Sequence, residues 1–235
     1  MILRRALARQ TSTALPLYDL ANLVRTFTKC GEKGISHPNT VLVGTSNLKS
    51  MAAIDVAGFV ADLKDHAVTH GFHVHDERHF VETYSLRQAW EVDLHPEDGC
   101  GGPVDLHIEL DVDPRTLLAF EDAVLGLPDD VDPPDEFHFP LVLTWSLPPM
   151  PHSPDLLRLA IDLAPIGGLE MPLEVTASDS FASPTEASER RISIVARRAI
   201  SLSQVAKGED PLCDIFERGH SVSDFLLQAA DSWLG

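Results

Sequence analysis

The sequence predicts an α+β fold with a mainly antiparallel sheet and helices packed on one face. Apolar residues recur at helical spacing over residues 19–30 and 50–70. Over residues 72–112 they instead alternate with polar residues, as in strands with one solvent-exposed face. Because helices and strands are segregated rather than strictly alternating, an α+β arrangement is favoured over a parallel sheet.

The first half of the chain is expected to contain two helices, then a strand-rich region, then a third helix. The helix over 19–30 stops at Gly31, and the helix over 50–70 stops at Gly71. Predicted strands cover 40–43, 72–75, 79–84, 88–94 and 104–112. A helix then begins at Asp113 and Pro114, since Asp is a favoured N-cap and Pro a favoured first residue.

The second half follows an acidic, proline-rich loop over residues 127–136. Strands are predicted over 137–145, 156–163 and 173–176, with a loop over 178–188 and a helix over 192–202. A short helix over 211–219 and a terminal helix that starts at Ser221 complete the chain. The predicted organisation is one domain, residues 1–235, with the 127–136 loop as a candidate internal boundary.

The composition is acidic, with 36 Asp and Glu against 18 Lys and Arg and a net charge of −18. This charge disfavours binding to nucleic acids or anionic membranes and favours a partner with a basic surface. The first 34 residues differ, because six basic residues against two acids give them a net charge of +4. That segment is interpreted as a basic helix, with a transit peptide as the alternative.

Localisation is predicted from the absence of two further patterns. No apolar run reaches the roughly 20 residues that span a bilayer. The three cysteines, Cys30, Cys100 and Cys213, are too few and too widely spaced for a disulfide framework. A cytoplasmic location is therefore expected.

A candidate metal site lies on the predicted hairpin of the strands at 88–94 and 104–112. If these strands pair, one face collects Trp90, Val92, Leu94, Leu106, Ile108 and Leu110. The other face carries Asp93, His95, Asp105, His107 and Glu109, with Asp93 opposite His107 in one permitted register. Imidazole and carboxylate groups are ligands for zinc, manganese or iron, and the alternative is a solvent-exposed polar face.

Other histidines and one cysteine offer further hypotheses. His66 and His70 share one face of the predicted 50–70 helix, and His73, His75 and His79 follow shortly after. Cys100 lies in the Gly-rich connection 95–103, where His95 or His107 is expected nearby, as in a Cys–His nucleophile. For both sets the alternative is a structural role.

Three short segments, at residues 41–46, 54–56 and 104–107, together resemble the motifs of nucleotidyltransferases. The segment Val41-Leu-Val-Gly-Thr-Ser46 resembles their turn, and Ile54-Asp55-Val56 resembles half of their carboxylate strand, with Ala53 in place of the first Asp. Val104-Asp-Leu-His107 is similar to the later strand that supplies a third carboxylate. The resemblance implies two-metal phosphoryl chemistry.

The predicted function is that of an intracellular acidic protein-binding or accessory protein without a complete catalytic motif. No P-loop, dinucleotide-binding glycine motif or nucleophile elbow is present. The alternative is a metal-dependent hydrolase or nucleotidyltransferase-like enzyme that uses Asp93, His95, Asp105, His107 and Glu109. No catalytic residue or resident cofactor is assigned beyond this candidate divalent metal.

Overall fold

The computed structural model describes residues 54–128, 130–150, 153–181 and 189–234, all within a unit formed by residues 43–235. The helix predicted over 19–30, the strand over 40–43 and the turn at 41–46 lie outside the described residues. The strands are β1 (Phe72–Val81), β2 (Gln88–Pro96), β3 (Asp105–Val112), β4 (His138–Ser146), β5 (Leu173–Ser180) and β6 (Glu189–Ser201). The α-helices are α3 (Val56–Thr69), α4 (Pro114–Leu125), α5 (Leu156–Gly167), α6 (Leu202–Lys207) and α7 (Leu212–Leu234).

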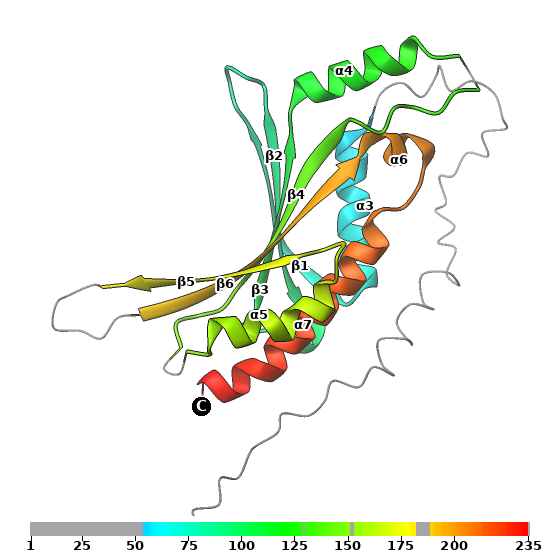
Figure 1. Ribbon diagram of the computed structural model, residues 1–235. Coiled ribbons are helices and arrows are strands. Elements are labelled where there is room, and N and C mark those ends of the chain that lie inside the picture. Colours follow the sequence, from blue (N-terminus) through cyan, green and yellow to red (C-terminus); the bar gives the residue numbers. More distant parts are fainter. Residues whose placement is uncertain (1–53, 129, 151–152, 182–188, 235) are drawn as a thin grey trace, which may run out of the picture. The chain divides into compact units, whose positions relative to one another are not determined.

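The strands form one six-stranded sheet in the order β1-β2-β3-β4-β6-β5, and every neighbouring pair is antiparallel. The predicted α+β class is therefore confirmed. β3 and β4 pair directly although the 127–136 loop lies between them in the chain, so the described strands on both sides of that loop share one sheet. Figure 1 shows α3, α5 and α7 together on one side of this sheet.

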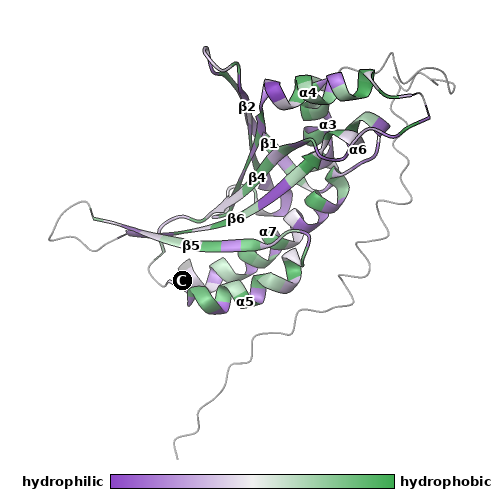
Figure 2. Cartoon of the chain, turned by 45° about the horizontal axis from the view of Figure 1, so that its top comes forward, coloured by the Kyte–Doolittle hydropathy of each residue, from purple (hydrophilic) through white to green (hydrophobic). Residues whose placement is uncertain are grey.

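The core lies between these helices and one face of the sheet. Strand residues on that face are almost completely buried and include Val92, Leu94, Leu106, Ile108, Leu110, Leu141, Leu143, Trp145, Ile192, Ile194 and Ala196. The helices bury one side each, and Figure 2 shows apolar and polar residues side by side along α5 and α7. One buried hydrogen bond, from Trp145 Nε1 to Ser223 Oγ at 2.9 Å, joins β4 to α7. No helix among the described residues is both long and apolar enough to cross a membrane.

The β2–β3 hairpin has the register that the alternation predicts. Asp93 pairs with His107 and Glu91 with Glu109, while Val92 pairs with Ile108 on the buried face. The burial of β3 alternates along its whole length, because successive side chains of a strand point to opposite faces. The sorting of apolar and polar residues between the two faces is thus confirmed.

β1 is one strand rather than the two predicted over 72–75 and 79–84. Its pairing with β2 shifts between Val74, which pairs with Leu94, and Asp76, which pairs with Asp93. His75 is therefore the extra residue of a β-bulge. The bulge changes which residues share a face, so the simple alternation that marks a strand is interrupted there.

Two predictions in the second half of the chain were wrong. Residues 156–163 belong to helix α5, whose N-cap Asp155 accepts a hydrogen bond from the backbone amide of Arg158. Residues 192–201 belong to strand β6, in which Ile192, Ile194 and Ala196 are buried in alternation. In both segments the apolar residues fit either period, and the tertiary packing decides between them.

The C-terminal helix was also predicted incorrectly, as two helices with a new start at Ser221. α7 is continuous from Leu212 to Leu234, and Gly219 lies within it. Ser221 does not cap a helix, because its hydroxyl donates to the carbonyl of Glu217 one turn earlier.

Candidate functional site

Two groups of polar side chains lie on β1, β2, β3 and the turn between β2 and β3, with their strand members on the face of the sheet opposite the core. The first, here called the imidazole–thiol cluster, consists of His73, His75, His95 and Cys100. The second, here called the Arg78 network, consists of Asp76, Arg78, Glu91, Asp93 and His107.

Strand pairing positions the three histidines of the imidazole–thiol cluster. His73 pairs directly with His95, and their ring centroids are 5.7 Å apart. The bulge at His75 brings a third ring to the same place, with its Nε2 atom 2.7 Å from Nε2 of His95. The rings of His75 and His95 have centroids 3.7 Å apart.

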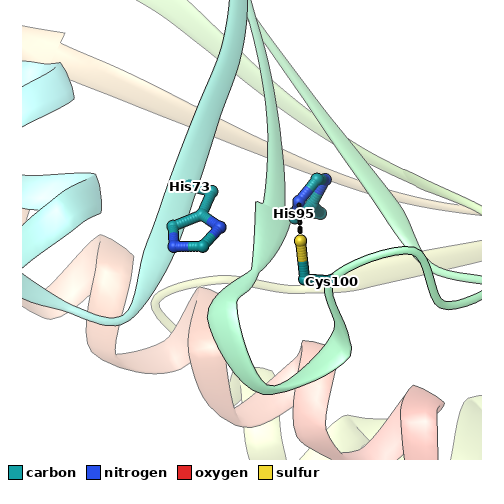
Figure 3. A group of neighbouring side chains, drawn as sticks. All are labelled: His73, His95 and Cys100. Carbon is teal, nitrogen blue, oxygen red and sulfur yellow. Dashed lines mark hydrogen bonds between the residues drawn. The ribbon is translucent and has the colours of Figure 1, made fainter.

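A glycine turn brings Cys100 to His95. Gly101 adopts a positive φ of 76°, and a Cβ on Gly102 would lie 2.7 Å from the Gly99 carbonyl oxygen, so both positions favour glycine. The Cys100 Sγ atom lies 3.3 Å from Nε2 of His95, as Figure 3 shows. One ligand atom from each of His73, His95 and Cys100 lies within 4.8 Å of the others.

The surroundings of His95 favour its neutral form. Only 7% of His95 is exposed, although it lies on the polar face. Burial lowers its pKa below the usual imidazole range, and the neighbouring His75 and His73 lower it further, against the opposing effect of Asp105. A neutral imidazole has a free lone pair and can bind a metal ion, whereas a thiolate–imidazolium nucleophile needs the charged ring.

In the Arg78 network, one guanidinium neutralises several carboxylates. Arg78 donates to Glu91 Oε2 at 3.0 Å, Asp93 Oδ2 at 2.7 Å and Asp76 Oδ2 at 2.9 Å. Nδ1 of His107 lies 2.7 Å from the other carboxylate oxygen of Asp93. Burial opposes ionisation of Asp93, but the hydrogen bonds from His107 and Arg78 outweigh it and hold the pKa of Asp93 below its usual value.

The structure therefore divides the five residues predicted to form a metal site. His95 lies in the imidazole–thiol cluster, whereas Asp93 and His107 bind each other within the Arg78 network. Asp105 and Glu109 lie exposed on β3, and Asp105 acts on His95 through its charge alone. Both oxygens of Asp93 already contact protein donors, so a metal ion there would have to displace Arg78 or His107.

The remaining histidines have other contacts. Nε2 of His66 lies 2.8 Å from Asp210 Oδ2, and its Nδ1 lies 2.8 Å from the Asp62 carbonyl oxygen. His79 stacks on Trp90 with ring centroids 3.8 Å apart. His66 and His70 thus share a helix face, as predicted, but their ring nitrogens contact different groups.

His70 is part of a second trio of potential ligands with Cys213 and Glu217, within 4.8 Å of one another. Cys213 is disulfide-bonded, which the wide cysteine spacing did not predict, so its thiolate is not available and this trio is not a free ligand set.

Asp55 does not lie on a strand, which bears on the nucleotidyltransferase resemblance. Its side chain accepts a hydrogen bond from the Gly58 amide at 2.9 Å and is the N-cap of α3. The carboxylate that would stand for half of the metal-binding strand therefore caps a helix.

Sequence reasoning identified His73, His75 and Cys100 only as members of separate hypotheses. The proximity of Cys100 to His95 was predicted, and what was missed is the convergence of His73 and His75 on His95, which depends on the pairing of β1 with β2. Regular pairing from Val81 opposite Gln88 would place His73 opposite Pro96, and only the bulge at His75 brings His73 opposite His95, so the alternation carried no signal for this contact.

Comparisons with known proteins yield no relative on which to base a function. No protein-family model matches the chain, and neither the curated proteins nor the solved structures contain a match.

Proposed function

We propose that the protein is an intracellular accessory protein that binds a partner with a basic surface through the polar face of its sheet. The observation that carries the proposal is the exposure of that face. Strand residues that point away from the core, such as Asp105, Glu109, Ser146, Glu174 and Arg197, are exposed. An antiparallel sheet with one open face offers a flat surface to a partner.

The charge on this face supports a basic partner rather than an acidic one. The three strands at one edge carry Asp76, Glu91, Asp93, Asp105, Glu109 and Asp111. Arg78 and Arg87 neutralise part of this charge. Among the described residues, Asp105 and Glu109 form no ion pair and remain available to cations of a partner. Complementary charge of this kind speeds association and selects partners.

Apolar side chains at the end of the β1–β2 hairpin would supply the contacts that charge alone does not. Phe80, Val81, Tyr84 and Leu86 are all at least half exposed, and Tyr84 is 97% exposed. Leu86 has a φ of +58°, a conformation that costs a non-glycine residue about 1–2 kcal/mol. Exposed aromatic residues beside a charged surface are typical anchors of protein interfaces.

The test compares two variants with the same net charge. Asp105→Lys/Glu109→Lys reverses charge on the proposed face, and Asp122→Lys/Asp231→Lys reverses two exposed charges on α4 and α7. The full-length proteins would be immobilised and exposed to lysate of the source cell at low and high salt, with bound proteins quantified by mass spectrometry. We expect wild type and the helix variant to retain the same basic proteins at low salt, and the face variant to lose them.

Two results would contradict the proposal. Equal loss of partners by both variants would mean that net charge alone attracts them. Equal recovery by all three proteins at high salt would mean that binding does not depend on the charges of this face.

A further inference from the structure

We propose that His73, His95 and Cys100 bind a zinc ion, with His75 as the fourth ligand. The proposal is independent of the protein-binding function and rests on the geometry of the imidazole–thiol cluster. It differs from the metal site predicted from the sequence, because it contains no carboxylate and shares only His95 with it.

The distances within the cluster are close to those of a zinc site. Tetrahedral zinc with bonds of about 2.0–2.1 Å to nitrogen and about 2.3 Å to sulfur places its ligand atoms about 3.3–3.6 Å apart. The separation of His95 Nε2 from Cys100 Sγ is 3.3 Å. One ligand atom from each of His73, His95 and Cys100 lies within 4.8 Å of the other two. Rotations of these side chains would shorten the separations to those of ligands around one zinc ion.

His75 is the residue best placed to complete the tetrahedron. Its Nε2 lies 2.7 Å from His95 Nε2, which is closer than two ligands of one zinc ion. When His95 Nε2 binds a metal ion, its lone pair is used in the bond and it carries no proton. The hydrogen bond between His75 and His95 is then lost, and His75 is released. To join the same ion, His75 would have to move away from His95 to a separation of about 3.3 Å and turn toward His73 and Cys100.

The chemistry of the set suits zinc. Two or three imidazoles with one thiolate form a borderline-soft site, which hard ions such as magnesium and calcium do not prefer. His73 and His95 sit on paired strands, and the turn that carries Cys100 packs against Leu227 of α7, so three ligands have fixed backbones. Binding would release the Cys100 thiol proton to solvent.

The test is a metal titration of the full-length protein, with the disulfide of Cys213 left intact, using zinc and, as a spectroscopic substitute, cobalt. We expect one equivalent of cobalt to give thiolate-to-metal charge-transfer absorption and intense tetrahedral bands, which zinc then abolishes. Cys100→Ala should remove the charge-transfer band although Cys30 and Cys213 remain. His95→Ala and Cys100→Ala should each weaken binding by more than about a hundredfold, beyond the loss caused by a missing outer-shell partner.

The matched controls are His79→Ala on β1 and His107→Ala on β3, which remove nearby histidines that are not in the cluster. Both should bind metal with unchanged affinity. Absence of binding by wild type, or equal loss in His107→Ala, would overturn the proposal. His75→Ala should reduce the tetrahedral band intensity, and an unchanged spectrum would overturn the assignment of His75 as the fourth ligand. Circular dichroism of each variant would confirm that it is folded.

Discussion

The imidazole–thiol cluster and the Arg78 network are neighbours on β1 and β2, completed by the turn that carries Cys100 in one case and by His107 of β3 in the other, yet their close polar groups are neutralised differently. In the network, the guanidinium of Arg78 supplies positive charge to Asp76, Glu91 and Asp93. In the cluster, the groups around His95 are two histidines and a cysteine, all potential ligands. The difference suggests a rule that the predictions below test: on this sheet a metal ion is expected only where no arginine already fills the role of the cation.

The largest expected effect is stabilisation of the protein by zinc through the cluster alone. At a free zinc concentration 100-fold above Kd, ligand binding to the folded state raises the free energy of unfolding by about 2.7 kcal/mol. Urea unfolding of wild type and of His107→Ala should show this increase, whereas His95→Ala should show none. If zinc raised the free energy of unfolding of His95→Ala by the same amount, the metal would bind outside the cluster, and the cluster would not differ from the network in metal binding.

A smaller effect is expected from removing the charge at the centre of the network. Asp93→Asn should lower the free energy of unfolding at pH 7 by roughly 0.5–1 kcal/mol, as for a partly exposed ion-pair network. Because the folded state lowers the pKa of Asp93, its contribution is complete above the unfolded pKa and is lost as the pH falls through the folded pKa.

Urea unfolding at pH 7 and pH 3 checks this sign. The difference in free energy of unfolding between wild type and Asp93→Asn should be smaller at pH 3 than at pH 7. Asp122→Asn, at an exposed position on α4, should differ little from wild type at either pH. A gap of equal size at both pH values would show that packing, and not charge, holds the network together.

The sequence was sufficient to predict the hairpin that carries both regions. In β2 and β3 every second residue is apolar, so a shift of one position would expose Val92, Leu94 and Ile108 together. The same reasoning failed for residues 156–163 and 192–202. Leu157, Leu159, Ile161 and Leu163 alternate, yet they lie in a helix, and of these four only Leu159 and Leu163 are buried.

The candidate site was harder to predict, because it depends on contacts between strands and on a local irregularity. The bulge at His75 has no signature in the alternation, since it inserts one residue into an otherwise regular pattern. Arg78 lies opposite Glu91 in the regular part of the hairpin, whereas the pairing of His73 with His95 follows only from the register shift at the bulge. For this reason sequence reasoning grouped Asp93 with His95, although the structure gives them different partners.

The smallest and most discriminating effect is expected when Arg78 is removed from the network. Arg78→Met keeps the aliphatic stem but leaves Asp76, Glu91 and Asp93 without the guanidinium. Three carboxylates should then bind calcium weakly, with a Kd of about 1 mM. At 1 mM calcium this corresponds to a stabilisation of about 0.4 kcal/mol, which titration calorimetry and urea unfolding can measure together. The control is Arg197→Met, which frees only Glu174 and should gain no calcium binding. If Arg78→Met binds calcium no better than Arg197→Met, the arginine is not what separates the two regions.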